Sequence, residues 1–199
     1  MIKLTEDYLQ RFGGVGRLYG RQALSRFAAS SVMVIGLGGV GSWSVEALAR
    51  SGIGRILLVD LDDVCLTNVN RQIQATSATV GTAKVAALRD RIESISPGCR
   101  VEGFDTFFKP ATAERILETR PDFILDAMDD VKAKALFVSL CREKQIPCAV
   151  SGSVGGRKDI TRVHQKDLTQ TVNDRLLAKL RKILRNEYGF PRETRRRFK

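Results

Sequence analysis

A glycine-rich turn that directly follows an apolar strand constrains this chain more than any other feature. Residues 32–35 read Val-Met-Val-Ile, and a turn with four glycines comes next. Glycines at this spacing let backbone amides approach a phosphate, and the following helix offers free N–H groups and the positive end of its dipole. A second apolar run ends in Asp60, where an acid accepts hydrogen bonds from ribose hydroxyls. The pattern predicts a nucleotide-binding β-α-β unit with the turn glycines Gly36, Gly38, Gly39 and Gly41.

The chain then alternates strands and helices. This predicts an α/β fold with a doubly wound, mainly parallel, Rossmann-like sheet that carries helices on both faces. Strands are expected over residues 32–36, 55–60, 100–104, 122–127 and 147–151. Helices are expected over residues 41–51, 82–95, 111–119 and 131–144. Parallel strands place their carboxyl ends at one edge of the sheet, so residues that follow the strands are expected to meet there.

Both ends of the chain depart from this alternation. Residues 5–29 read as helical, with a glycine-rich interruption at 11–17. Beyond residue 151 we expect a loop, a strand at 160–165, a basic amphipathic helix at 172–187 and a solvated or disordered tail over 191–199. We therefore expect an N-terminal helical segment (1–31), a Rossmann-like nucleotide-binding domain (32–165) and a basic helix with its tail (166–199).

The composition is that of a globular protein. The 199 residues are 43% hydrophobic and 28% charged, which is enough to bury a substantial core. No apolar stretch approaches the roughly 20 residues that span a bilayer, and the N-terminus lacks the apolar region of a signal peptide. We therefore expect a cytoplasmic protein with no membrane association. Four cysteines without a Cys-x-x-Cys pair argue against a zinc knuckle and against structural disulfides.

Polar residues after the second strand favour ATP over a dinucleotide. A dehydrogenase needs a proton-relay group near the nicotinamide, typically a histidine, and the single histidine is His164, in the basic C-terminal part. An adenylating enzyme instead needs cations that hold a triphosphate and offset the charge developing at the attacked phosphorus. Arg71, in the loop after the second strand, and Lys84, at the start of the next helix, are placed for that task. The alternative for each is an ordinary surface cation.

Carboxylates at the end of the fourth strand indicate a metal site. Asp126 and Asp129 fall at this strand's carboxyl end and just beyond it. A carboxylate there can bind a Mg²⁺ ion that bridges the phosphates. Asp129 is the better candidate, because Asp126 is suited to cap the turn. Asp130 reads as a helix N-cap or a solvent-facing neighbour.

Most of the excess positive charge lies near the C-terminus. Residues 152–199 hold 14 basic and 5 acidic residues, a net charge of +9, whereas residues 1–151 hold 19 and 17, a net charge of +2. Such asymmetry is typical of a protein that binds a polyanion, and a solvated helix face is the alternative. The candidate nucleic-acid contacts recur at helical spacing and are Arg175, Lys179, Lys182 and Arg185.

Five motifs resemble, in order and spacing, the adenylation domain of ubiquitin-activating enzymes and of the bacterial relatives that activate sulfur-carrier proteins. They are Gly36–Gly41, Asp60–Asp62, Asn68–Gln72, Gly81–Lys84 and Asp126–Asp129. The resemblance covers residues 8–165. Within that superfamily, residues 11–20, 41–43 and 62–68 are most similar to the tRNA threonylcarbamoyladenosine dehydratases, which use ATP to cyclise the threonylcarbamoyl group on an adenosine next to the anticodon.

The resemblance implies a role for individual residues. Asp60 would hold the ribose, and Asp129 would hold the metal ion. The phosphates would be held by Asn70, Arg71 and Lys84, and the nucleotide site also includes Asp62 and Gln72. Arg17 matches an arginine that in relatives reaches the nucleotide of the partner subunit, which implies a homodimer. ATP and Mg²⁺ are the implied cofactors, while a monovalent cation (Na⁺ or K⁺) and a sulfur-transfer protein partner are left open.

The leading prediction is therefore an ATP-dependent dehydratase that acts on tRNA. Its substrate carboxylate would attack the α-phosphate of ATP and form a mixed anhydride, which an internal nucleophile then displaces. One alternative is an activator of a ubiquitin-like sulfur carrier, and another is a catalytically incomplete nucleotide- or RNA-binding module. Family members usually continue through a further region with a cysteine-bearing segment, so we expect the C-terminal part to be shortened.

Overall fold

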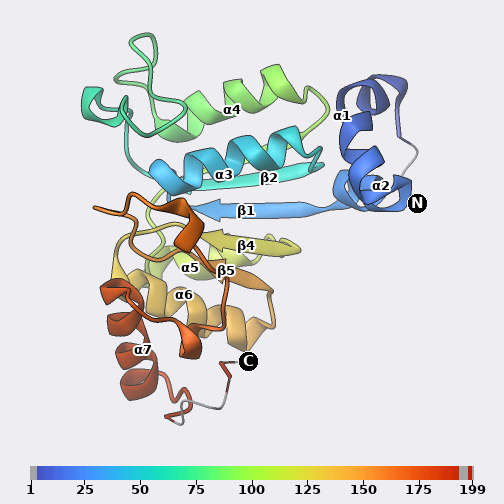
Figure 1. The fold of residues 1–199 in the computed structure, drawn as a ribbon. Coiled ribbons are helices and arrows are strands. Elements are labelled where there is room, and N and C mark those ends of the chain that lie inside the picture. The colour runs from blue at the N-terminus through green and yellow to red at the C-terminus, as the bar shows by residue number, and fades with distance from the viewer. Residues whose placement is uncertain (1–3, 193–196, 199) are drawn as a thin grey trace.

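The computed structural model describes residues 4–192, 197 and 198 and arranges them around a five-stranded sheet (Figure 1). The strand order is β3-β2-β1-β4-β5, and each strand runs parallel to its neighbours. The strands are β1 (Ser31–Ile35), β2 (Arg55–Asp60), β3 (Arg100–Asp105), β4 (Phe123–Asp126) and β5 (Cys148–Val150). The strand order reverses between β1 and β4, and ligands of doubly wound sheets bind beside such a switch point, at the carboxyl ends of the strands.

Helices cover both faces of the sheet, as predicted (Figure 1). The helices α3 (Gly39–Arg50) and α4 (Lys84–Ile95) pack on one face, and α5 (Pro110–Leu117) and α6 (Val131–Lys144) pack on the other. Strands β1 and β2 are apolar at nearly every position, and successive side chains point to opposite faces, so both strands contribute to both cores. All the strands and helices expected between residues 32 and 151 are present, with ends within two residues of the prediction.

The N-terminal helices break at a different glycine from the one expected. Helix α1 (Glu6–Tyr19) runs through the glycines at 13, 14 and 16, and the chain turns at Gly20, whose φ is 88°, before α2 (Arg21–Ala29). The predicted interruption at 11–17 is therefore wrong. A helix tolerates interior glycines at a cost of ~1 kcal/mol each. A Cβ at Gly16 would lie 3.0 Å from Cδ2 of Leu24, so this glycine lets α2 pack closely on α1.

The segment after β5 contains helical turns and no strand among its described residues. The expected strand at 160–165 is wrong, because Ile160–Arg162 forms the 3-10 turn η2. The carboxylate of Asp159 accepts hydrogen bonds from the backbone N and the hydroxyl of Thr161, and such local bonds compete with strand pairing. A second short turn, η3, spans Leu168–Gln170, and η1 spans Leu66–Asn68 in the loop after β2.

The basic amphipathic helix is confirmed as α7 (Arg175–Glu187). It packs on α6 through Leu177, Leu180 and Leu184, which are buried (Figure 1). Part of the predicted tail, residues 193–196 and 199, lies outside the described residues. The rings of Phe190 and Phe198 lie 4.9 Å apart, so the end of the chain is not solvated throughout as expected. No helix among the described residues is long and apolar enough to cross a membrane.

Candidate nucleotide site

Two of the predicted turn glycines are required by close packing at the end of β1. Gly36 has a φ of 86°, and a Cβ there would lie 2.9 Å from the backbone of Ala127 and Met128. A Cβ at Gly41 would lie 1.8 Å from the carbonyl oxygen of Gly36. These two glycines let the turn after β1 contact both α3 and the turn after β4.

The other two glycines leave open space at the start of α3. A Cβ at Gly38 would meet no atom within 4 Å, and one at Gly39 would make only ordinary contact with the side chain of Arg71, at 3.5 Å. Gly38 is the N-cap of α3, and no side chain caps this helix end. The first backbone amides of a helix lack intrahelical partners and favour an anion. The start of α3 at Gly38 is therefore open and carries the backbone donors that favour an anion.

Asp60 holds this turn in place from the end of β2. Its carboxylate is buried, with Oδ2 accepting a hydrogen bond from the backbone N of Leu37 at 2.6 Å and Oδ1 accepting one from the backbone N of Asp62 at 2.9 Å. Sequence reasoning assigned Asp60 to a ribose and missed this structural function. Each carboxylate oxygen can accept a second hydrogen bond, so the two functions are compatible.

Lys84 lies beside Asp60 and Asp62, as the shared edge of the sheet predicts. Its Nζ atom is 2.7 Å from Oδ2 of Asp62 and 3.9 Å from Oδ1 of Asp60. The backbone N of Lys84 also donates to the carbonyl oxygen of Asp62, at 3.0 Å, so the loop between β2 and α4 closes on itself. A buried ammonium thus lies at the first turn of α4 next to the glycine turn.

Arg71 is brought to the start of α3 by the same loop. Its side chain is exposed, contacts Gly39, and donates from Nη1 to the carbonyl of Thr67 at 2.9 Å and to Oδ1 of Asn70 at 3.0 Å. The indole N–H of Trp43 donates to the carbonyl of Arg71, at 3.0 Å, and so fixes the loop on α3. The aliphatic part of the Arg71 side chain therefore lies beside Gly39, and the loop residues Thr67 and Asn70 hold its guanidinium.

Two buried amides anchor this loop, and sequence reasoning missed one of them. Gln72, expected to bind the nucleotide, is buried, and its Oε1 accepts a hydrogen bond from Nε2 of Gln74 at 3.1 Å. The same Nε2 donates to the carbonyl of Leu37 at 3.0 Å. Gln72 and Gln74 thus connect the loop to the glycine turn. The motif contains Gln72, but no pattern in the sequence distinguishes Gln74 from an ordinary loop residue.

The turn after β4 carries the predicted metal ligand. Asp129 is exposed, and Asp130 is the N-cap of α6, accepting hydrogen bonds from the backbone N of Lys132 at 2.7 Å and of Ala133 at 3.3 Å. Among residues 4–192, 197 and 198, no three His, Cys, Asp or Glu side chains form a cluster that could hold a metal ion. Asp129 alone is therefore the candidate carboxylate at this turn.

Asp126 caps the same turn and also forms a buried ion pair. Its Oδ1 accepts a hydrogen bond from the backbone N of Met128 at 2.9 Å, and its Oδ2 lies 3.0 Å from Nζ of Lys134. Burial raises the pKa of the Asp126 carboxyl, while the ammonium of Lys134 and the Met128 amide act in the opposite direction. Sequence reasoning missed Lys134, because a lysine in a helix usually faces solvent.

Arg17 lies away from these residues in its own chain. It is exposed near the end of α1, and α1 and α2 pack at the amino ends of the strands, where the hydroxyl of Tyr8 donates to the carbonyl of Gly52 at 2.6 Å (Figure 1). The glycine turn lies at the opposite edge of the sheet.

The basic residues of α7 do not all face the same way. Arg175, Lys179 and Lys182 are exposed. Arg185 is half-buried, donates from Nε to the carbonyl of Pro191 at 3.1 Å, and lies 5.6 Å from the ring centre of Phe198. The structure therefore groups three of the four predicted nucleic-acid contacts on one open face.

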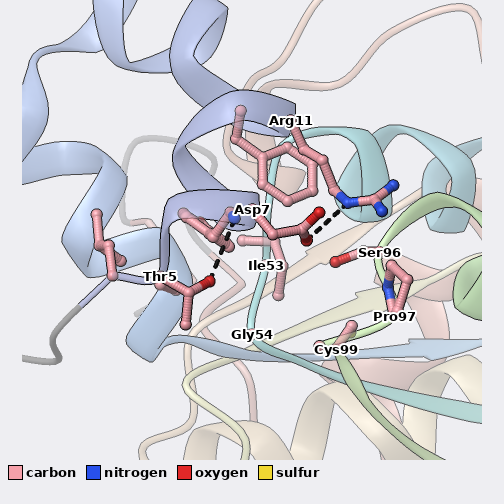
Figure 2. A pocket seen from close by; sticks show the side chains of 13 residues that line it. Thr5, Asp7, Arg11, Ile53, Gly54, Ser96, Pro97 and Cys99 are labelled. Atoms are coloured by element: carbon pink, nitrogen blue, oxygen red, sulfur yellow. Dashed lines mark hydrogen bonds and ion pairs between the residues drawn. The ribbon is translucent and has the colours of Figure 1, made fainter.

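A separate cavity of about 200 Å³ lies at the amino ends of the strands (Figure 2). Thr5, Asp7 and Arg11 of the α1 region face Gly54, Ser96 and Cys99 across it, and Asp7 pairs with Arg11 at 2.8 Å. This cavity is at the edge opposite the glycine turn, so it is not the nucleotide site.

Comparisons with known proteins agree with this geometry. Residues 14–187 match the model of the ThiF family. The chain is 44% identical over 193 residues to the tRNA threonylcarbamoyladenosine dehydratase of Haemophilus influenzae, covering 97% of this chain and 74% of that protein. It is 35% identical over 155 residues to the adenylyltransferase and sulfurtransferase MOCS3 of Anopheles gambiae, covering 77% of this chain and 35% of that protein.

A solved structure extends the likeness to the whole fold. The crystal structure of the E. coli tRNA N6-threonylcarbamoyladenosine dehydratase in complex with ATP matches with a TM-score of 0.96 and 42% identity, covering 99% of this chain and 81% of that chain. These matches extend well beyond the glycine turn that many nucleotide-binding proteins share. This chain belongs to the ThiF family.

Proposed function

We propose that this protein is an ATP-dependent dehydratase that cyclises the threonylcarbamoyl group of threonylcarbamoyladenosine in tRNA. The observation that carries the proposal is the match, over 99% of the chain, to a dehydratase of this kind in complex with ATP. The open glycine turn with Arg71 and Lys84 beside it supplies the chemistry that such an activity needs.

ATP is held at the carboxyl edge of the sheet. The amides at Gly38 and Gly39 and the cations of Arg71 and Lys84 bind the phosphates, with Asn70 orienting the guanidinium. Asp60 binds the ribose and at the same time fixes the glycine turn. Asp62 pairs with Lys84, and Gln72 fixes the loop. These cations stabilise the charge that develops at the attacked phosphorus.

Asp129 is the residue proposed to hold Mg²⁺. Its exposed carboxylate lies in the turn after β4, and that turn contacts Gly36 of the glycine turn. Magnesium in nucleotide sites is usually bound by one or two carboxylates together with phosphate oxygens. The metal ion would neutralise phosphate charge there.

The reaction removes one carboxylate oxygen from the substrate. Because this oxygen leaves as part of AMP, hydroxide does not have to act as a leaving group. The threonylcarbamoyl carboxylate attacks the α-phosphate of ATP, and pyrophosphate leaves. A nucleophile within the same threonylcarbamoyl group then attacks the activated carbonyl carbon, and AMP departs with the former carboxylate oxygen. Arg71 and Lys84 favour the first step, because they offset the added negative charge at the α-phosphate.

The tRNA contacts are proposed to lie on α7 and the loop before it. The exposed residues Arg175 and Lys179, together with Arg157, line a hollow of about 460 Å³, and Lys182 extends the cationic surface along the helix. Cations grouped in this way bind phosphates with a strong dependence on salt. Contacts on this surface would bring tRNA near the carboxyl end of β5, which is at the same edge of the sheet as the nucleotide turn.

A homodimer completes the proposal. Arg17 is exposed and lies at the far edge of its own sheet, so it would serve the site of the second subunit. As a tRNA-modifying enzyme, the protein is proposed to act in the cytoplasm.

Exchange of labelled pyrophosphate into ATP tests the proposed activity. We expect exchange that depends on tRNA carrying threonylcarbamoyladenosine and that is absent with tRNA lacking the modification. Exchange that requires a ubiquitin-like carrier protein would support a sulfur-carrier activator instead, and nucleotide binding without any exchange would support a binding module.

A further inference from the structure

Two fully buried charges lie next to the nucleotide turn. Lys134 of α6 and Asp126 at the end of β4 both have 0% exposure, and their Nζ and Oδ2 atoms are 3.0 Å apart. Removing two charges from water is costly, and apolar replacements of such pairs are often neutral or stabilising. Stability alone therefore does not account for an ion pair at this place.

The ammonium of Lys134 joins the ends of two strands. Besides Asp126, Nζ donates to the carbonyl oxygen of Ser151, the residue that follows β5, at 3.0 Å. The backbone N of Ser151 in turn donates to the carbonyl of Asp126 at 2.8 Å. Lys134 thus bridges the carboxyl ends of β4 and β5 through side-chain contacts, beside the backbone hydrogen bond that joins the same two residues.

On one side of Lys134, the contacts lead to Asp129. Asp126 holds the backbone N of Met128 at 2.9 Å, and the backbone N of Ala127 donates to the carbonyl of Ile35 at 2.8 Å. The backbone directly before Asp129 is therefore fixed between β1 and the Asp126 carboxylate.

On the other side, the contacts lead to α7. The backbone N of Ser153 donates to Oδ2 of Asp174 at 2.9 Å, and Oδ1 of Asp174 caps α7 at the backbone N of Leu177, also at 2.9 Å. A Cβ at Gly152 would lie 2.4 Å from Oδ2 of Asp174, so this segment and the helix start are in close contact. Lys134 is the side chain that connects this segment to the turn that carries Asp129.

We propose that Lys134 is a positioning residue for adenylation, which fixes the turn of Asp129 relative to the segment that leads to α7. The inference rests on the proposed function for its kinetic consequence. ATP binding is proposed to depend on the glycine turn, Arg71 and Lys84, whereas the ammonium of Lys134 donates to Asp126 and Ser151. Loss of Lys134 should therefore reduce the rate of the chemical step and leave ATP affinity nearly unchanged. A displacement of about 1 Å at a reacting group can cost 10²-fold in rate.

The test compares Lys134→Met, the double variant Asp126→Asn/Lys134→Met, and Lys132→Met as a control on the exposed side of the same helix. Lys134→Met leaves a buried carboxylate unpaired and should lower Tm by roughly 10 °C. The double variant should regain most of the lost Tm. The introduced amide oxygen still accepts a hydrogen bond from the backbone N of Met128, and no charge is left buried. All kinetic assays are run well below the lowest Tm.

We expect the double variant to bind ATP within about two-fold of wild type while kcat for tRNA-dependent exchange stays about 10²-fold low. Amide hydrogen exchange of the nucleotide-free protein should be faster at residues 127–131 and 151–153 in this variant and unchanged in Lys132→Met. A double variant that regains both wild-type kcat and wild-type amide protection would overturn the positioning role. If wild type itself shows no pyrophosphate exchange, the proposed function fails, and the amide protection still decides whether Lys134 orders the two segments.

Discussion

The Nζ atom of Lys84 lies 2.7 Å from Oδ2 of Asp62, and the two side chains differ sharply in exposure, at 7% for the lysine and 54% for the aspartate. A buried ammonium is therefore paired with a carboxylate that is itself more than half exposed. Under the proposed function, a phosphate of ATP would replace the Asp62 carboxylate as the partner of Lys84.

Lys84→Ala and Arg71→Ala should each lower the rate of pyrophosphate exchange by at least about 10²-fold, the usual cost of removing one preorganised group that stabilises developing charge. Circular dichroism and thermal melting should show that both variants fold. Lys132→Ala, an exposed cation of α6, serves as the control and should exchange at the wild-type rate. Near-normal exchange in both site variants would show that these cations do not hold the phosphates.

Asp129 and Asp130 form a matched pair for testing the metal site. Asp129→Ala should remove Mg²⁺-dependent turnover and preserve most of the affinity for nucleotide measured without metal. Asp130→Ala removes the N-cap of α6 and should lower stability by ~1 kcal/mol while turnover persists. Turnover that survives in Asp129→Ala, with an unchanged dependence on Mg²⁺, would disprove the metal assignment.

Substitutions at two of the turn glycines should affect different properties, ligand binding at Gly38 and stability at Gly36. Gly38 has a φ of −78° and a Cβ there meets no atom within 4 Å, so Gly38→Ala should fold normally. It should weaken ATP binding about ten-fold, because the methyl group obstructs the approach of phosphate to the amides. Gly36→Ala is instead expected to lose more than the roughly 1–3 kcal/mol that a strained backbone position costs, since φ there is 86° and the added Cβ would also lie 2.9 Å from the backbone of Ala127 and Met128. Titration calorimetry and urea unfolding measure the two effects, and a Gly38→Ala variant with wild-type affinity would exclude phosphate from this turn.

The fold could be predicted from the sequence because its strongest signals are local. The continuous apolar run of β2 and the glycines after β1 specify a buried parallel strand and a tight turn, respectively. The break between α1 and α2 could not be placed from glycine content, because Gly13, Gly14 and Gly16 all lie within α1 and the chain turns at Gly20. The 160–165 segment has β-branched residues, yet the side chain of Asp159 satisfies the local backbone and no strand forms.

The candidate site was predictable where it depends on residue type and on strand ends. Lys84 lies near Asp60, and Arg71 lies beside Gly39, because the segments that follow parallel strands gather at one edge of the sheet. Lys134 and Gln74 were not predictable, since their importance comes from burial by residues distant in the sequence. Arg185 continues the helical spacing of the basic residues before it. Its side chain instead contacts Pro191 and Phe198, so it does not join the exposed cations of α7.

Complementation between inactive variants tests the role of Arg17 across a dimer. Mixed Arg17→Ala and Lys84→Ala subunits should form heterodimers in which one site has both residues intact, so partial activity should return after mixing and refolding. Each variant alone should remain inactive. Sedimentation should show a dimer at micromolar concentration. Failure of mixing to restore activity in a protein that is dimeric would place Arg17 outside the neighbouring site.

The exposed cations of α7 should govern the salt dependence of tRNA binding. A triple variant that carries Arg175→Gln, Lys179→Gln and Lys182→Gln should have a flatter dependence of tRNA binding on salt. The slope of the logarithm of the binding constant against the logarithm of the salt concentration should change by about one unit for each phosphate that is no longer neutralised. Arg185→Gln on the same helix should change the slope much less, and ATP affinity should not change in either variant. A triple variant with the wild-type slope would mean that this face is only solvated.

The path of the carboxylate oxygen shows directly whether the protein adenylates the carboxylate of its tRNA substrate. tRNA whose threonylcarbamoyl carboxylate carries heavy oxygen is incubated with the protein, ATP and Mg²⁺, and the nucleoside and the nucleotide products are analysed by mass spectrometry. If the tRNA carboxylate is adenylated, the modified adenosine loses one water, AMP and pyrophosphate form in equal amounts, and one heavy oxygen appears in the phosphate of AMP. Formation of ADP and phosphate, or AMP free of heavy oxygen, would contradict adenylation of the tRNA carboxylate.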